Sequence, residues 1–411
     1  MTPVTVATRP AVAAPTGTAR LTAGRAPDFA SHLADFGPLP RLSPEALLDE
    51  LRASGLEGRG GAAFPAWRKI AAAQARERAR GRRAVVIGNA AEGEPLSSKD
   101  VTLLRMAPHL VIDGLLSVAA ALGAGSIHLY GPESALQAVS RALAERPDGR
   151  AIDLRPSAES FVSGEASAVV SALAGRRPVP QDRTVRLTQS GLNGRPTLVH
   201  NVETLAQIAL IARFGAAWFR SVGTETDPGT RLVTISGDVA SPGVLEIEGG
   251  TRLLDVLRFA GSDTASLSAV LVGGYHGAWV PTSGFQARLD RDHLAPFGAS
   301  VGAGILMALD ARRCPLTIAS SIATYLAGET AGQCGPCVNG LPAMAEVLHR
   351  LARGDRNAGL PGEVRRLADL VTGRGSCHHP DGTARFVLST LTVFAADVAA
   401  HLAGRCAKDH S

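Results

Sequence analysis

Two glycine-rich segments that end near a lysine are the first places in this chain where chemistry is expected. The 411 residues include 42 lysines and arginines, but only Lys69, Lys99 and Lys408 are lysines. Lys69 ends the segment 58–69 (GRGGAAFPAWRK), and Lys99 lies near the end of the segment 89–100 (NAAEGEPLSSKD). Glycines let backbone N–H groups approach a phosphate or a planar ring, and an ammonium group binds phosphate as a compact point charge. We therefore interpret both segments as ligand-contacting loops.

The second loop also carries two acidic residues, Glu92 and Glu94. They are either solvated loop acids or members of a functional site together with the lysines. We favour the functional interpretation, because carboxylates beside cations in a ligand site are typical of groups with perturbed acid–base behaviour.

Three cysteines near the C-terminus form the second chemical signal. Cys334 and Cys337 are separated by Gly-Pro and lie between two predicted helices, and Cys377 lies between two later helices. Their loops could bring three thiolates together around a metal or an iron–sulfur cluster. A zinc site that adds His378 or His379 is an alternative. A thioredoxin-like redox motif would need a βαβ context, which this region lacks.

The other two cysteines, Cys314 and Cys406, are interpreted as small apolar residues without a ligand role. Five cysteines are an odd and sparse set for a secreted disulfide scaffold. We therefore expect a reducing, cytoplasmic environment, where the protein could be peripheral to a membrane complex.

Composition restricts the class of protein further. With 45% hydrophobic residues the chain can form two or three domains, and its net charge of +5 comes from scattered arginines, so no nucleic-acid partner is expected. No apolar stretch is expected to span a membrane, because the best candidates are interrupted by Asp113, Asp310 or Asp397. The Ala/Pro/Thr-rich N-terminus indicates a disordered tail rather than a signal peptide.

Short apolar strands alternate with helices in the first half of the chain. This alternation predicts a parallel sheet, and ligands gather at the carboxyl ends of such strands. The predicted helices are 43–54, 103–122, 133–145 and 165–174, and the predicted strands are 83–88, 126–130 and 151–155.

The pattern changes after residue 230. Strands are predicted at 231–235, 243–247 and 269–272 with a helix at 252–259, which is typical of a small mixed β-grasp-like unit. Helices at 317–326, 341–352, 363–372 and 385–403 predict a C-terminal bundle that could hold a cofactor between its loops.

Several motifs occur in a fixed order along the chain. After the two loops come Gly164-Glu165, the segment 191–197 (GLNGRPT), the segment 201–204 (NVET) and the final cysteines. In this order they resemble the NADH- and FMN-binding subunit of respiratory complex I, a family shared with NAD-linked hydrogenases and NAD-dependent formate dehydrogenases. The resemblance extends over about residues 40–402.

The resemblance implies an α/β Rossmann-like FMN domain (39–228) after a disordered tail (1–38), a small β-grasp domain of the soluble-ligand-binding type (229–300) and a C-terminal α-helical bundle with an iron–sulfur motif (301–411). It implies NAD(P)H as substrate, with FMN and an iron–sulfur cluster as cofactors. The residues that would contact or frame FMN are Gly58, Arg59, Gly60, Gly61, Lys69, Asn89, Glu92, Gly164, Glu165, Asn201 and Thr204. Phe64 would lie near the nicotinamide nucleotide, Glu94 and Lys69 are the candidate catalytic residues, and Cys334, Cys337 and Cys377 are the candidate cluster ligands.

Five positions depart from the family pattern. Ala91 stands in place of Asp, Ala166 in place of Glu, His200 in place of Asn, Arg186 in place of an aromatic residue that would stack on adenine, and Ala331 in place of a cluster cysteine. The cluster would therefore be a [4Fe-4S] or [3Fe-4S] form with an incomplete cysteine set, and Arg186 could favour NADPH.

Two functions remain open on these grounds. The chain is either an FMN-dependent NAD(P)H oxidoreductase subunit, or a non-catalytic electron-transfer or assembly subunit that keeps the fold. In both cases the expected partner is an electron-transfer protein, either ferredoxin-like or a membrane reductase subunit.

Overall fold

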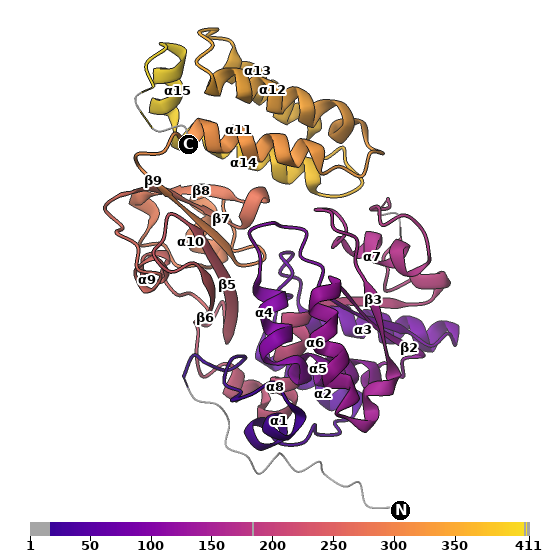
Figure 1. Ribbon diagram of the computed structural model, residues 1–411. Helices are drawn as coiled ribbons and strands as arrows, with labels where there is room; N and C mark the ends of the chain where they lie inside the picture. The colour runs from indigo at the N-terminus through magenta and orange to yellow at the C-terminus, as the bar shows by residue number, and fades with distance from the viewer. Residues whose placement is uncertain (1–16, 183–184, 407, 409–411) are drawn as a thin grey trace, which may run out of the picture.

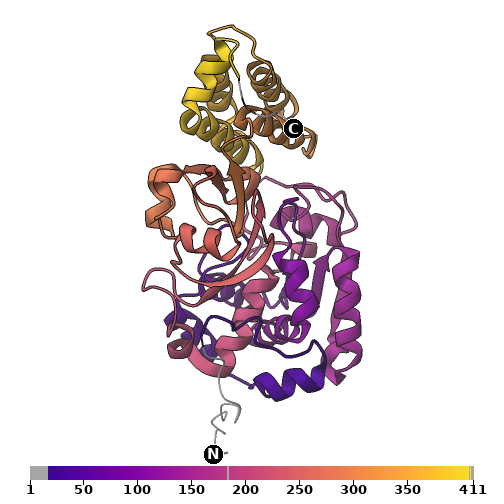
Figure 2. The ribbon, with the colours of Figure 1, turned by 60° about the vertical axis from the view of Figure 1, so that its left-hand side comes forward.

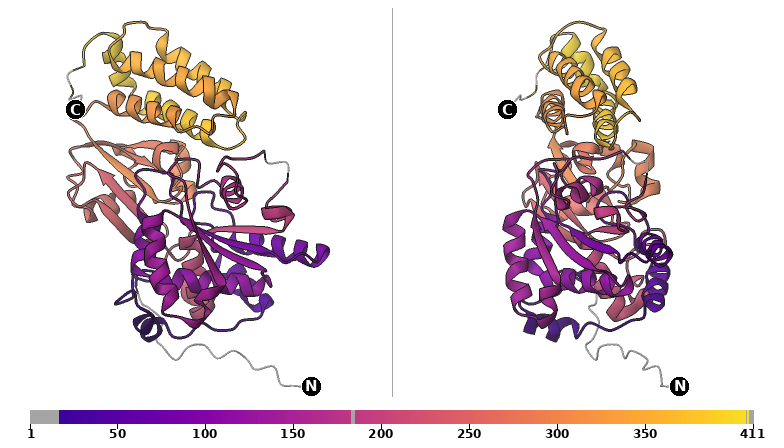
Figure 3. Two further views of the ribbon diagram at one scale, coloured as in Figure 1. Left: turned by 45° about the vertical axis from the view of Figure 1, so that its right-hand side comes forward. Right: turned by 90° about the vertical axis from the view of Figure 1, so that its right-hand side faces the viewer.

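The computed structural model describes residues 17–182, 185–406 and 408. Figure 1 shows an α/β unit, a second β-sheet and a helical bundle. In Figure 2 these parts follow one another along the long axis of the molecule. Helix α14 (His379–Val393) of the bundle packs against strand β8 (Ala278–Pro281) of the second sheet. Figure 3 shows this arrangement from two further sides.

The α/β unit is built on a four-stranded parallel sheet with the strand order β3-β2-β1-β4. The parallel sheet predicted from the alternation of strands and helices is thus confirmed. Its strands are β1 (Val85–Asn89), β2 (Ser126–Gly131), β3 (Ile152–Pro156) and β4 (Thr197–Asn201). Its helices are α2 (Pro44–Ser54), α3 (Ala66–Arg80), α4 (Lys99–Met106), α5 (Pro108–Ala121), α6 (Glu133–Ala144), α7 (Ala166–Leu173) and α8 (Val202–Phe219), with 3₁₀ turns η1 (Pro147–Ala151) and η2 (Leu192–Gly194).

Two features of this unit differ from the prediction. The single helix expected at 103–122 is two helices, α4 and α5, that meet at an angle of 96°. Pro108 has no N–H to continue the hydrogen bonds of α4, so it starts a new helix instead. Helix α3, strand β4 and helix α8 were not predicted as elements.

The N-terminal segment is folded where the structure describes it. Residues 29–36 form helix α1, and the Arg20 guanidinium donates to the carbonyl oxygens of Trp218 and Phe219 at 3.0 Å each. The backbone N–H groups of residues 20–22 donate to the carboxylate of Glu246 in the second sheet. The expectation of a disordered tail is therefore wrong for residues 17–38, and its remainder, residues 1–16, lies outside the described part of the chain.

Helix α8 corrects the expectation that no apolar segment reaches membrane-spanning length. Among the described residues it is the one single helix whose length and composition would allow it to cross a membrane. The bent pairs α4–α5 and α14–α15 (Ala395–Leu402) meet the same criterion when each pair is taken as one span. However, 89% of α8 is buried inside the protein, where it packs against α5 and α2. Its apolar composition on all sides therefore matches a position in the core.

The second sheet has five strands in the order β6-β5-β9-β7-β8. Strands β5 and β9 are parallel and the other pairs are antiparallel. Strand β9 lies beyond residue 300, where the sequence placed the end of this unit. The further strands are β5 (Thr230–Gly237), β6 (Gly243–Glu248), β7 (Leu267–Val272) and β9 (Ile305–Asp310), and the helices and turns are α9 (Leu253–Phe259), α10 (Arg291–Leu294), η3 (Gly274–His276), η4 (Thr282–Gly284) and η5 (Ala295–Phe297).

The C-terminal bundle follows β9. Its elements are α11 (Pro315–Gly328), the π-helical turn η6 (Pro336–Gly340), α12 (Leu341–Ala352), α13 (Leu360–Val371), α14 and α15 (Ala395–Leu402). The helix expected at 385–403 is two helices, α14 and α15, which meet at an angle of 78° beside Phe394. The bundle has its own apolar core, which includes Cys314 and Cys337.

Candidate functional site

The glycine loop lies over the carboxyl end of β4. Its base is closed by a hydrogen bond from Gly58 N to Phe64 O at 2.9 Å. A Cβ atom on Gly60 would lie 3.2 Å from Cβ of Asn201, and Gly61 has φ +103°, a conformation that glycine adopts at low cost. Glycine at these two positions therefore favours the close approach of the loop to the strand end. The Phe64 side chain, at this closed end of the loop, is 47% exposed and available for stacking.

Three predicted residues meet at this edge of the sheet. Asn89 and Asn201 are register partners at the ends of β1 and β4. The Asn89 side chain donates to the carbonyl of Gly164 at 2.9 Å, which draws the third loop in beside the first two. A Cβ atom on Gly164 would lie 2.5 Å from the carbonyl oxygen of Ala91, so this approach also requires glycine. The loops expected to contact one ligand therefore lie together.

Lys69 is partly buried beside strand β4. Its ammonium group donates to the carbonyl oxygen of Val199 at 2.7 Å. Burial lowers the pKa of Lys69, and burial together with this ammonium group holds the pKa of His200 well below its ordinary value. The structure thus holds the Lys69 ammonium group next to the site, although removing this cation from water is unfavourable.

Lys99, by contrast, belongs to the interior. It is 1% exposed, and its ammonium group pairs with Asp100 at 2.6 Å and with Glu203 at 2.9 Å. Glu203 also accepts a hydrogen bond from Leu232 N at 2.9 Å and so links the α/β unit to the second sheet. Lys99 therefore supports the loop from beneath, and Glu203 is a positioning residue that the sequence did not single out.

Arg59, Glu165 and Thr204 are engaged with neighbouring protein groups. The Arg59 N–H donates to the Thr204 hydroxyl at 2.9 Å, and its buried guanidinium lies 3.5 Å from the carboxylate of Asp227. Glu165 caps helix α7 by accepting hydrogen bonds from Ser167 N at 2.8 Å and from Ala168 N. These three side chains frame the loops and fix their shape.

The two acids of the second loop have different surroundings. Glu92 accepts hydrogen bonds from the Ser97 hydroxyl and from Val101 N. Glu94 accepts one from Tyr275 N at 2.8 Å through Oε2, whereas its buried Oε1 has no hydrogen-bond partner among the described residues. Burial raises the pKa of Glu94 to about 7, against the lowering effect of the backbone N–H groups of Tyr275 and Leu96. Glu94 is therefore poised to hold or release a proton near neutral pH.

The three predicted cluster cysteines are neighbours at one end of the bundle. Cys337 N donates to Cys334 O at 3.0 Å in the turn before α12, and the Cys334 thiol contacts the Ser376 hydroxyl at 3.4 Å, beside Cys377. Burial, together with the charges of Cys377 and Cys334, raises the pKa of Cys337 to about 12. A bound cation would reverse this effect, because thiolates are the ligand form.

The two histidines beside Cys377 make other contacts. His378 lies 3.1 Å from Asp381, and His379 contacts the Leu326 carbonyl at 2.8 Å and His276 at 3.1 Å. These contacts do not favour the zinc alternative that used His378 or His379.

Aromatic rings fill the space between Glu94 and the cysteine loops. The rings of Phe161 and His276 are 4.6 Å apart, those of His276 and His379 5.0 Å, and those of Tyr275 and Tyr325 5.7 Å. They come from the α/β unit, the second sheet and the bundle. No sequence motif marked them, because each is a single aromatic residue in an unrelated segment. The loops and the cysteines thus belong to one packed assembly.

Glycine loops at the carboxyl ends of a parallel sheet, joined to a helical bundle with grouped cysteines, define a class of flavin- and iron–sulfur-binding proteins. Comparison with known proteins agrees. A family described as Nuo51 FMN-binding domain matches residues 51–210, one described as NADH-ubiquinone oxidoreductase-F iron-sulfur binding region matches residues 317–401, and an SLBB domain matches residues 232–265.

Individual relatives cover most of the chain. The F subunit of the NADH-quinone oxidoreductase of Escherichia coli is 30% identical over 87% of this chain and 84% of its own length. The HndC subunit of the NADP-reducing hydrogenase of Solidesulfovibrio fructosivorans is 28% identical over 88% of this chain and 77% of its own length. A crystal structure of an NAD⁺-reducing [NiFe]-hydrogenase in the H₂-reduced state has a TM-score of 0.80 at 29% identity, and this chain covers 64% of that chain. The chain belongs to the family of NADH-quinone oxidoreductase F subunits.

Proposed function

We propose that this chain is an electron-transfer subunit that oxidises NADH or NADPH through bound FMN and an iron–sulfur centre and passes the electrons to a partner protein. The observation that carries the proposal is the meeting of three glycine-bearing loops at the carboxyl ends of β1 and β4. When bound, FMN supplies a group that can accept two electrons together as a hydride and release them one at a time. The relatives are subunits of NADH-quinone oxidoreductases and hydrogenases, which supports an electron-transfer partner.

The residues present fit FMN. Glycine at positions 60 and 164 lets the loops pack closely around this strand end, and backbone N–H groups of the glycine loop are suited to phosphate or ring carbonyls. Asn89 and Asn201 shape the floor, and Lys69 places a cation beside it. The other members of the proposed site are Gly58, Arg59, Gly61, Glu92, Glu165 and Thr204.

On the nucleotide side we assign Phe64 to stacking and Glu94 to proton control. Glu94 has one carboxylate oxygen without a partner among the described residues, and its raised pKa keeps part of the population protonated at neutral pH. Together with Lys69 it is the proposed catalytic pair.

The cysteine group fits an iron–sulfur cluster with an incomplete ligand set. Cys334, Cys337 and Cys377 supply three thiolates, and Ala331 cannot act as the fourth ligand. We therefore propose a [4Fe-4S] cluster with a non-cysteine fourth ligand, or a [3Fe-4S] cluster. The proposed layout is a Rossmann-like FMN domain, a β-grasp domain and this bundle, with a ferredoxin-like protein or a membrane reductase subunit as partner, in a cytoplasmic or membrane-peripheral location.

FMN binding is tested by fluorescence titration of the flavin-free protein. Gly60→Ala and Lys69→Ala are expected to weaken binding by about tenfold or more, which corresponds to about 1.4 kcal/mol. Gly362→Ala is the matched control, because a Cβ atom there meets no atom within 4 Å. Saturable binding that neither site variant changes would contradict the proposed pocket.

A second function is favoured by the substitutions at Ala91, Ala166, Arg186 and Ala331, which remove polar or stacking groups of the family pattern. It is a non-catalytic electron-transfer or assembly subunit. Stopped-flow flavin reduction by NADH and by NADPH separates the two functions. If the FMN-loaded protein is reduced by neither nucleotide, the non-catalytic function is correct.

A further inference from the structure

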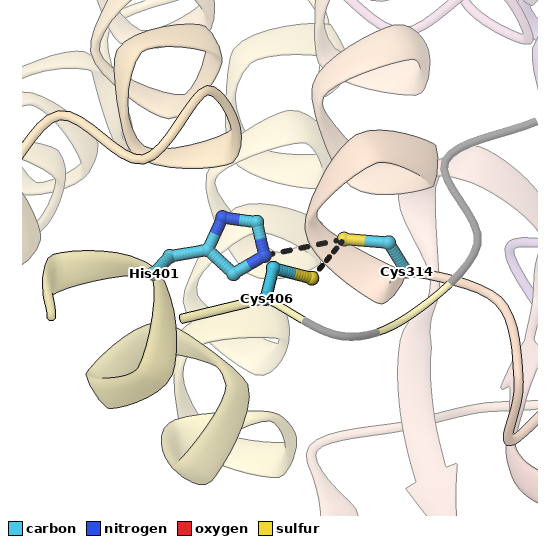
Figure 4. A group of neighbouring side chains, drawn as sticks. All are labelled: Cys314, His401 and Cys406. Atoms are coloured by element: carbon cyan, nitrogen blue, oxygen red, sulfur yellow. Dashed lines mark hydrogen bonds between the residues drawn. The ribbon is translucent and has the colours of Figure 1, made fainter. Parts of the chain in front are cut away.

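A cluster of metal-ligating side chains lies at the opposite end of the bundle from the cysteines discussed above. Cys314, His401 and Cys406 place one ligand atom each within 4.8 Å of one another (Figure 4). Cys314 precedes α11, whereas Cys334 and Cys337 follow it, so a helix of 14 residues, about 21 Å long, separates the two groups. The two groups therefore cannot serve one metal centre.

The distances within the cluster match tetrahedral zinc coordination. Zn–S bonds of about 2.3 Å and Zn–N bonds of about 2.0–2.1 Å at tetrahedral angles put two sulfurs about 3.8 Å apart and a sulfur and a nitrogen about 3.6 Å apart. The sulfurs of Cys314 and Cys406 are 3.9 Å apart, and Cys314 Sγ lies 3.3 Å from His401 Nε2. A disulfide would need an S–S distance of about 2.05 Å.

The histidine is oriented as a metal ligand. His401 Nδ1 lies 3.1 Å from the carbonyl oxygen of Leu351, which can only accept a hydrogen bond. Nδ1 therefore carries the proton, and Nε2, the nitrogen that faces the sulfurs, presents its lone pair. Metal-bound histidines typically hold their second nitrogen in this way.

The backbone also prepares the two sulfur ligands. Cys314 is the N-cap of α11, and its side chain makes no capping hydrogen bond to that helix. After α15, Gly404 adopts φ +67° and Arg405 N donates to Ala400 O at 2.8 Å, a turn that brings Cys406 back toward α11. Cys314 and His401 are each 1% exposed, so a bound ion would be shielded from water on that side.

We infer that Cys314, His401 and Cys406 bind one Zn²⁺ ion, with a fourth position open to water, and that this ion fastens the C-terminal end of the chain to the start of α11. Binding converts the two thiols to thiolates and releases their two protons to solvent. Two sulfurs and an imidazole are a ligand set that suits zinc. The site is independent of the proposed FMN and cluster sites.

Metal analysis of the full chain, purified anaerobically, tests this inference. Zinc and iron are measured in the same sample, with about one zinc expected per chain. Cys406→Ser and His401→Ala are expected to lose zinc and keep iron, whereas Cys377→Ser is expected to keep zinc and lose iron. In Cys406→Ser and His401→Ala the affinity for Zn²⁺ should fall by more than the roughly 10–100-fold that results when a metal-binding side chain loses only its hydrogen-bond partner. The inference is overturned if both site variants keep their zinc, or if they lose iron instead of zinc.

A measurement on the unmodified chain avoids dependence on variants that fail to fold. Co²⁺ added to the metal-free protein should give the absorption bands of a tetrahedral cobalt–thiolate centre, and prior addition of Zn²⁺ should suppress them. Absence of these bands overturns the inference. So does mass spectrometry that finds the peptides of Cys314 and Cys406 joined by a disulfide in the anaerobically purified, metal-free protein.

Discussion

Replacement of Glu94 by glutamine is expected to stabilise the protein at pH 8 and not at acidic pH. The side chain carries a buried Oε1 without a partner among the described residues, while Oε2 accepts the N–H of Tyr275. A glutamine amide oxygen can accept the same hydrogen bond without bringing a negative charge into this position. Glu94→Gln therefore removes the cost of the charge and keeps the contact.

The magnitude follows from the pKa of Glu94, which folding raises from 4.5 to about 7. Between these pH values the folded protein holds a proton that the unfolded chain releases, so the free energy of unfolding falls as pH rises from about 4.5 to about 7 and then stays constant. Each pH interval of one contributes about 1.4 kcal/mol, so the rise of the pKa sets an upper bound of about 3.5 kcal/mol. Because part of the side chain is exposed and screened by solvent, we expect about 1–2 kcal/mol.

Thermal unfolding of wild type and Glu94→Gln at pH 5 and pH 8, at one ionic strength and one scan rate, measures this effect. The variant is expected to unfold about 1–2 °C above wild type at pH 8, with a much smaller difference at pH 5. Glu92→Gln is the matched control in the same loop and should not stabilise at either pH, because Glu92 accepts hydrogen bonds from Ser97 and Val101. A difference between Glu94→Gln and wild type that is independent of pH, or a variant less stable at pH 8, would refute the reasoning.

Three further predictions concern charge, nucleotide and cluster. Lys99→Met leaves two buried carboxylates without their cation and should lower the free energy of unfolding by about 3–5 kcal/mol in denaturant titrations, whereas Arg366→Met, in an exposed ion pair, should leave the midpoint unchanged. Arg186→Phe should shift the ratio of flavin reduction rates toward NADH in stopped-flow measurements, because it removes a cation that could meet a 2′-phosphate, and an unchanged ratio would contradict this role. Ala331→Cys should raise the iron content and convert a [3Fe-4S] electron paramagnetic resonance signal to a [4Fe-4S] signal, and identical spectra would show that position 331 does not reach the cluster.

Local patterns predicted much of the fold. The alternation of short apolar strands and helices predicted the parallel sheet, and the helix predicted at 43–54 is α2, with Ser43 as its N-cap. The bends at Pro108 and Phe394 were missed because a helical pattern continues across each of them. The second sheet was expected to end at residue 300, which left strand β9 out of it, because the pairing of β9 with β5 and β7 depends on segments far away in the chain.

For the candidate site, too, some features follow from the sequence and others only from the tertiary structure. The sequence by itself determined which residue types and glycines occur in each loop, and the order of these motifs identified the family. Only the tertiary structure decided which side chains face one another: Lys99 pairs inward with Glu203, while Glu94 meets Tyr275 of the second sheet. Cys314 and Cys406, 92 residues apart, come together across the bundle. Such pairings depend on packing between distant elements, and no local pattern records them.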